Sequence, residues 1–139
     1  MVIRISQLIP GLVVLALVAT AFAYTADQAA KGKELYVKNC AVCHGTNGQG
    51  GPVPEQFPSL AGEKAPPLVG PGHLPGMKTV GQVYDFASKK MPGNNPGSLK
   101  SDEYLDIISF ALEANGIKPD GKPLTPDSAK MIKLPGGKQ

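Results

Sequence analysis

Large side chains are scarce in this sequence. Its 139 residues include no tryptophan, only 6% aromatic residues, two cysteines and a single arginine. A domain this small buries a limited share of its surface, so it gains from a metal, a disulfide or an embedded cofactor. Two cysteines exclude a framework of several disulfides. We therefore expect a bound cofactor to supply the apolar core that the side chains alone do not fill.

Charge of either sign is also sparse. Lysine and arginine number 14 against 11 acidic residues, which gives a formal net charge of +3. This excess is too small and too dispersed for a nucleic-acid-binding surface. The sequence also has no strand pattern, internal repeat or heptad run, and its length fits one domain. We therefore expect an all-α domain with no nucleic acid partner.

Glycine and proline, by contrast, are abundant, with 17 and 14 copies. They concentrate over Gly45–Gly76, which excludes long regular elements there. Helix caps and helical spacing predict three helices around this loop region. The helices run from a capping box at Thr25 and Gln28 to about Asn39, over 79–90, and from a cap at Ser101 to a stop at Asn115 and Gly116.

The segment Met1–Ala23 has the pattern of an export signal. A lone cation, Arg4, precedes the apolar stretch 12–18, and small residues end the segment just before Tyr24. The sequence predicts cleavage there and a periplasmic location. The alternative is an uncleaved membrane anchor, since the apolar stretch could still span a bilayer with help. The remaining chain divides into a domain over 24–116 and an irregular, partly docked tail over 117–139.

Both cysteines lie in the motif Cys40-Ala-Val-Cys43-His44. Two thiols at this spacing can add to the two vinyl groups of one porphyrin, and the adjacent imidazole then becomes an axial ligand of the iron. A thioredoxin-like redox pair would need a βαβ context, and a zinc site would need two more ligands where only His73 remains. The motif, the export pattern and the helical pattern together indicate one covalently attached haem c.

A sixth iron ligand must come from elsewhere in the chain, and the candidates are Met91, His73, Met77 and Met131. Met91 is favoured because Pro92 opposes a helical conformation at the preceding residue. Its thioether can then point from extended backbone into a pocket between helices. Thioether sulfur is a soft, neutral ligand that favours ferrous iron and suits electron transfer.

The order of several motifs resembles that of class I cytochromes c. These motifs are Gly32-x-x-x-Tyr36, Cys40-Ala-Val-Cys43-His44-Gly45, Pro66-Pro-Leu-Val-Gly70, Met91-Pro92 and the last amphipathic helix. The resemblance covers about 26–116 and implies a cytochrome c fold, with long Gly/Pro-rich loops around one covalently bound haem. It also implies a single-electron carrier that is not itself an enzyme. A narrower likeness, over 91–104 and the residues after the last helix, is to cytochrome modules that serve pyrroloquinoline quinone dehydrogenases.

The resemblance also implies roles for individual side chains. Gly32 and Tyr36 would cross the last helix near 107–111. Pro67, or the proline before it, would offer its carbonyl to the second ring nitrogen of His44, and Leu68 would pack against the porphyrin. The implied partners are a redox donor and a redox acceptor, such as a quinoprotein dehydrogenase and a terminal oxidase.

Two other functions remain open from the sequence. One is a membrane-tethered cytochrome subunit of a larger redox complex, with membrane contact only if residues 1–23 are retained. The other is a ligand-binding or peroxidase-like haem protein with an open sixth site. It is disfavoured because no second imidazole lies near the haem motif and the sole arginine is Arg4, so a distal acid–base pair is missing. Lys89 and Lys90 either steer an acidic partner or complement a helix dipole.

Overall fold

The computed structural model describes residues 23–70 and 77–134. Within them the chain forms five α-helices, one short 3-10 helix and one pair of two-residue strands. In chain order these are α1 (Ala26–Asn39), α2 (Ala41–His44), β1 (Gly51–Pro52), η1 (Pro58–Leu60), β2 (Lys64–Ala65), α3 (Val80–Lys90), α4 (Ser101–Ala114) and α5 (Pro126–Met131). The predicted helical fold class is confirmed, while the strand pair and α5 are additions to it.

Helices α1 and α3 begin where the sequence predicts. Thr25 caps α1: its Oγ1 accepts the Gln28 N–H at 3.2 Å, and Gln28 Oε1 accepts the Thr25 N–H at 3.3 Å. The same reciprocal pair, formed by Thr79 and Gln82, begins α3. Each box satisfies N–H groups that have no partner inside the helix.

Helix α4 is capped differently from the prediction. Ser101 is its first residue and Lys100 is its N-cap. The hydroxyl of Ser101 pairs with that of Tyr84 in α3 at 2.8 Å. The carboxylate of Glu103 instead accepts the Lys100 N–H at 2.8 Å. The predicted cap is wrong by one residue because a tertiary contact engages the serine.

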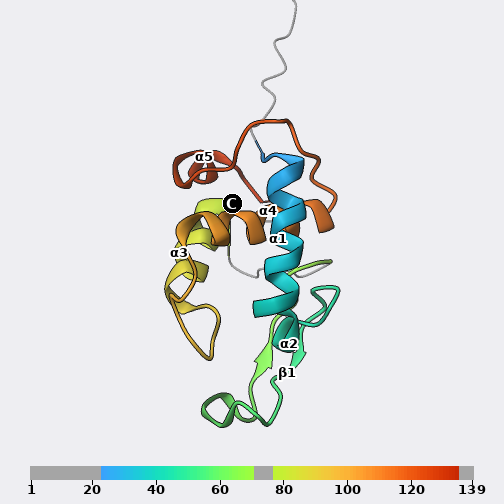
Figure 1. The fold of residues 1–139 in the computed structure, drawn as a ribbon, viewed down its shortest axis with the longest axis vertical. Helices are drawn as coiled ribbons and strands as arrows, with labels where there is room; N and C mark the ends of the chain where they lie inside the picture. Colours follow the sequence, from blue (N-terminus) through green and yellow to red (C-terminus); the bar gives the residue numbers. More distant parts are fainter. Residues whose placement is uncertain (1–22, 71–76, 135–139) are drawn as a thin grey trace, which may run out of the picture.

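Helices α1 and α4 cross in direct contact (Figure 1). A Cβ atom on Gly32 would lie 1.8 Å from the carbonyl oxygen of Asp106, so the backbones meet at a distance that only glycine permits. One turn later, the ring of Tyr36 packs on Phe110 with a centroid separation of 5.1 Å. The predicted crossing of Gly32 and Tyr36 with the last long helix is confirmed.

The chain after Gly116 returns to the body of the molecule. Thr125 caps α5, and Pro126 occupies its first turn, where a missing N–H costs nothing. Leu124 and Ile132, on either side of α5, are buried in the hydrophobic core. The prediction of an irregular tail is therefore corrected over 126–131, because the threonine–proline pair begins a helix there.

The first described residues pack against this returning chain. Tyr24 is fully buried, and its hydroxyl donates to the carbonyl of Ile117. The N–H of Ala23 donates to Oδ2 of Asp120 at 3.0 Å, and the N–H of Asp120 donates to the Tyr24 carbonyl at 3.2 Å. Residues 1–22 lie outside the described residues, so the predicted export signal remains a prediction. Across the described ranges, no helix combines the length and the apolar character needed to cross a bilayer.

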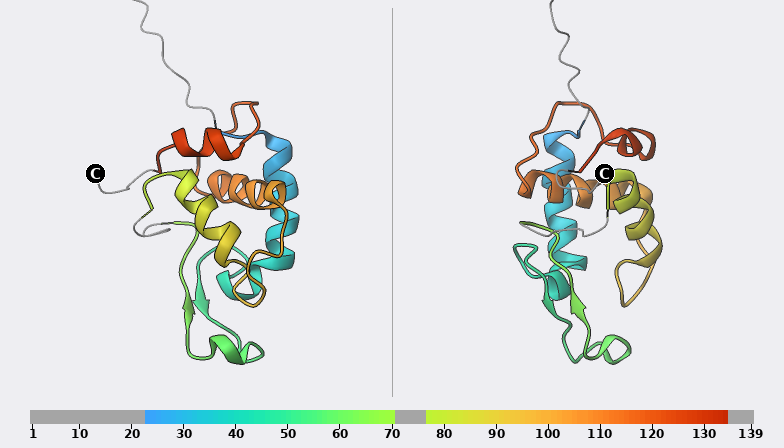
Figure 2. Two further views of the ribbon diagram at one scale, coloured as in Figure 1. Left: turned by 90° about the vertical axis from the view of Figure 1, so that its left-hand side faces the viewer. Right: turned by 180° about the vertical axis from the view of Figure 1, so that it is seen from behind.

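The Gly/Pro-rich stretch between α2 and α3 forms a hairpin arm over 51–65. In its antiparallel register, Gly51 pairs with Ala65 and Pro52 pairs with Lys64. Strands of two residues and a 3-10 turn agree with the predicted lack of long elements, although the pairing itself was not predicted. Figure 2 shows the arm at one end of the molecule, with α5 and the start of α1 at the opposite end.

Candidate functional site

His44 ends the short helix α2, directly after both cysteines. Its side chain is buried, with 7% of its surface exposed. Its Nδ1 lies 2.9 Å from the carbonyl oxygen of Pro66. A carbonyl can only accept, so Nδ1 carries the proton and Nε2 is the ring nitrogen suited to a metal.

The accepting carbonyl belongs to Pro66 and not to Pro67, the residue named first in the prediction. Two local contacts explain the choice. The Gly50 N–H donates to the His44 carbonyl at 2.8 Å. A Cβ atom on Gly50 would also lie 2.5 Å from the Ala65 carbonyl oxygen, so the two segments lie close together just before Pro66. The hairpin register continues this approach and places Pro66 beside the ring.

A cavity of about 420 Å³ lies against His44. Cys40, Cys43 and Met91 also contribute to its wall. The rest of the wall is mostly apolar and comes from the end of α1, α2, the hairpin arm, the loop after it, α3, α4 and the loop between these last two helices. Its apolar members include Val42, Val53, Leu60, Ala65, Pro66, Leu68, Met77, Val83, Phe86, Ala87, Leu99, Ile107, Ile108 and Ala111.

Met91 lies in extended backbone just past α3, as predicted, with φ −117° and ψ 154°. Its carbonyl accepts the Tyr104 hydroxyl at 2.6 Å and the Gly97 N–H at 3.1 Å. The sequence analysis did not single out Tyr104 for this role. The signal was present, because a buried tyrosine needs a partner for its hydroxyl.

The other candidates for a sixth ligand fall in different places. Met77 also lines the cavity, so the structure brings two thioethers to the same space as His44. Met131 lies on α5 with 82% of its surface exposed. His73 lies outside the described residues.

Both thiols are free and half-buried. Burial raises the pKa of Cys40 to about 11, and the nearby charge of Cys43 acts in the same direction. Redox-active cysteine pairs rely on a lowered thiol pKa. The surroundings of Cys40 therefore differ from those of a thioredoxin-like pair.

The side chains around the cavity fit an iron porphyrin. An imidazole nitrogen and a thioether are the axial donors typical of electron-transfer haem, and two thiols at the wall can hold the ring edge. The mostly apolar wall suits the ring itself. Tyr36 fixes the turn after His44, because its hydroxyl donates to the Gly45 carbonyl at 2.6 Å.

This chain is similar to one protein-family model and to several known proteins. The family model described as cytochrome c oxidase, cbb3-type, subunit III, matches residues 27–110. A thiosulfate dehydrogenase of Psychrobacter arcticus is 34% identical over 82 residues, which are 57% of this chain and 24% of that protein. The cytochrome c subunit of a quinone alcohol dehydrogenase of Gluconacetobacter polyoxogenes is 30% identical over 105 residues, or 72% of this chain and 22% of that one.

A solved structure is similar as well. The crystal structure of the sulfane dehydrogenase SoxCD from Paracoccus pantotrophus matches with a TM-score of 0.55 and 26% identity, over 86% of this chain and 63% of that chain. The chain spans about a quarter of the length of the sequence relatives named above. The likeness therefore concerns one domain of larger proteins.

Proposed function

The chain belongs to the cytochrome c family, and on that premise we propose that it carries single electrons on one haem c held between His44 and Met91. One observation supports this most directly: both residues line the same apolar cavity as Cys40 and Cys43. When bound, haem iron supplies a one-electron couple between its ferric and ferrous states.

In this proposal each cysteine holds the ring by a thioether. The thiol adds across a vinyl group: the sulfur bonds to one vinyl carbon and the hydrogen goes to the other. Cys40 closes α1 and Cys43 lies within α2, so the two sulfurs are presented from one continuous turn. His44 follows directly and would ligate the iron through Nε2, while the Pro66 carbonyl accepts the Nδ1 proton.

We assign the sixth ligand to Met91 and not to Met77. The backbone of Met91 is fixed at both polar groups, since its N–H donates to the Ala87 carbonyl at 2.9 Å and its carbonyl accepts from Tyr104. Met77 packs against the hydrophobic core cluster. A fixed backbone favours a ligand that must stay bound in both oxidation states.

A carrier role also follows from what surrounds the two ligands. The apolar wall limits the entry of water, and an iron held by both His44 and Met91 would have no open position for a substrate. We propose that the protein serves an exported dehydrogenase or membrane complex as donor and a terminal oxidase as acceptor. The names of the relatives support this class of partner, and the sequence of residues 1–23 supports a periplasmic location.

The central test is the absorption spectrum of matured protein. We expect haem that resists acid acetone extraction, a mass increase of one haem, and a near-infrared sulfur-to-iron band in the oxidised form. Met91→Leu should abolish the band, whereas the matched control Met77→Leu should keep it. Loss of the band in Met77→Leu alone would reassign the ligand. Absence of the band in the wild-type protein would exclude a thioether ligand and leave His73 or an open sixth site as the alternatives.

Docking can be tested at the last turn of α3, where Lys89 and Lys90 lie exposed beside Met91. If they steer an acidic partner, the double substitution to glutamine should slow electron transfer at low ionic strength and flatten its salt dependence. Lys33→Gln, an exposed change on α1, is the control. An unchanged rate and slope would leave the two lysines as a solvated helix end.

A further inference from the structure

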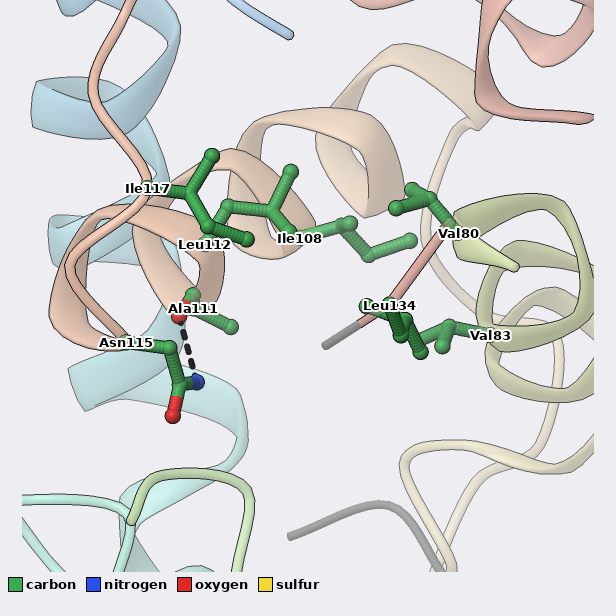
Figure 3. Close-up of a pocket in the computed structure, with 8 residues that line it drawn as sticks. All are labelled: Val80, Val83, Ile108, Ala111, Leu112, Asn115, Ile117 and Leu134. Carbon is green, nitrogen blue, oxygen red and sulfur yellow. Dashed lines mark hydrogen bonds between the residues drawn. The ribbon is translucent and has the colours of Figure 1, made fainter. Parts of the chain in front are cut away.

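The side chain of Asn115 joins the end of α4 to the loop 66–70. Its Nδ2 donates to the Leu68 carbonyl at 2.9 Å and to the Ala111 carbonyl at 2.8 Å. Its Oδ1 accepts the Gly70 N–H at 3.0 Å. Figure 3 shows the bond to Ala111, at the edge of a small apolar cavity of about 20 Å³. Both amide hydrogens and the amide oxygen are thus engaged.

The same loop is held from its other side by Gly48. The N–H of Leu68 donates to the Gly48 carbonyl at 2.8 Å, and the N–H of Val69 donates to it at 3.1 Å. Both polar backbone groups of Leu68 are therefore fixed, one by the turn after His44 and the other by Asn115. Gly48 contacts Leu68 through its backbone, whereas Asn115 does so through its side chain. The contact of Asn115 can therefore be removed by a substitution that leaves the backbone unchanged.

Two prolines connect this fixed point to the axial histidine. Pro66 and Pro67 precede Leu68, and each has a φ angle locked by its ring. Few torsions are left between Leu68 and the Pro66 carbonyl, which accepts the Nδ1 proton of His44 at 2.9 Å. The hairpin register therefore places the Pro66 carbonyl from one side, and the orientation of the Leu68 peptide constrains it from the other.

We infer that Asn115 is a positioning residue for the axial imidazole, acting through Leu68 and Pro66 on the hydrogen bond of His44. The inference rests on the proposed function, because it gives the bond a consequence at the iron. A strong Nδ1–H···O bond makes the imidazole a better electron donor, which favours ferric iron. Loosening the loop should weaken that bond and favour ferrous iron.

Asn115→Ser separates the contact of the amide with Ala111 from its contacts with Leu68 and Gly70. A serine hydroxyl can bond the carbonyl four residues earlier, so the contact with Ala111 can persist at the helix end. The shorter side chain cannot reach Leu68. We expect the His44 Nδ1 proton to exchange with solvent about tenfold faster. We also expect more than half of the haem to be ferrous at the wild-type midpoint potential.

Gln28→Ala is the matched control. The Gln28 amide holds a loop in the same manner, with Nε2 donating to the Leu124 carbonyl at 3.1 Å and Oε1 accepting the Leu124 N–H at 2.7 Å. It lies in the first turn of α1, whereas His44 follows the last turn. This variant should lose stability and keep the wild-type ring-proton exchange and midpoint potential.

The outcomes separate cleanly. If wild-type protein contains no haem, the proposed function fails. If it contains haem and Asn115→Ser keeps both the ring-proton exchange and the potential, the inference about Asn115 fails. Should Asn115→Ser not mature, Asn115→Asp provides the second test. It keeps an acceptor for Gly70 and removes both donors, so it must shift the same two readouts in the same direction for the inference to stand.

Discussion

The hydroxyl of Tyr104 donates a 2.6 Å hydrogen bond to the carbonyl of Met91. The hydroxyl oxygen of Tyr104 also accepts the N–H of Leu99 at 3.4 Å. Tyr104 is 3% exposed, so one buried hydroxyl from α4 joins the two ends of the loop that carries the proposed sulfur ligand.

Tyr104→Phe should therefore loosen Met91 without removing it. We expect the free energy of unfolding to fall by about 1 kcal/mol and the sulfur to be displaced by roughly fivefold less added imidazole. Loss of the near-infrared band during an imidazole titration measures the second effect. Tyr84→Phe, which removes a hydroxyl facing Ser101 on the exposed side, is the matched control. Equal titrations for wild type and Tyr104→Phe would contradict the role of the hydroxyl.

Gly32→Ala tests the crossing of α1 and α4. The added methyl group would overlap the Asp106 carbonyl at 1.8 Å, so the helices must separate and uncover Tyr36 and Phe110. We expect a loss of about 3 kcal/mol or more in the free energy of unfolding, or failure to accumulate folded protein. Lys33→Ala, at the next and exposed position, should change it by no more than about 0.5 kcal/mol. Denaturant unfolding followed by circular dichroism distinguishes the two.

Ile132→Ala tests whether the returning chain belongs to the core. Ile132 is 6% exposed and its carbonyl accepts the Val80 N–H at 2.9 Å, so truncation leaves a cavity beside the start of α3. The free energy of unfolding, measured by thermal denaturation, should fall by about 2 to 4 kcal/mol. The adjacent Met131→Ala should cost little, because Met131 is 82% exposed. If Ile132→Ala costs as little as Met131→Ala, the side chain of Ile132 does not contribute to the core and the segment is held by its backbone alone.

Stability should also decline at alkaline pH. Burial raises the pKa of Tyr24 to about 12, with the nearby charge of Glu113 adding to the effect, and burial likewise raises the pKa of Tyr36 to about 12. Between pH 10 and about 12 the unfolded chain loses these protons before the folded one does. The free energy of unfolding should hold below pH 10 and then fall by up to about 1.4 kcal/mol per pH unit for each tyrosine.

Tyr24→Phe removes one of these two groups. Its free energy of unfolding should therefore decline less steeply than that of wild type between pH 10 and 11. Tyr84→Phe leaves both groups in place and should decline as wild type does. An identical decline in Tyr24→Phe and wild type would show that Tyr24 does not titrate over this range.

The elements that could be predicted from sequence are those with local causes. Thr25 with Gln28 and Thr79 with Gln82 form their capping boxes within four residues, and Pro92 acts on its immediate neighbour Met91. The spacing of Cys40, Cys43 and His44 likewise carries its chemistry within one turn. None of these depends on how distant segments meet.

The features that could not be predicted from the sequence depend on how distant segments of the chain meet. The choice of Pro66 over Pro67 follows from where Gly50 meets Ala65, and two-residue strands leave no alternation to detect. Ser101 loses its capping role to a hydroxyl in another helix. Helix α5 is an intermediate case. Its start, Thr125 followed by Pro126, can be recognised in the sequence, but the burial of Leu124 and Ile132 beside it cannot.

The meeting of Gly32 with Asp106 also has a consequence for the order of assembly. The first helix finds its main partner in α4, which begins only at Ser101, so the intervening loop must close before either helix is stabilised. A nascent chain that stops short of α4 cannot shelter Tyr36 or complete the cavity wall that faces His44. The thiols of Cys40 and Cys43 consequently emerge early and stay accessible until the last third of the polypeptide arrives.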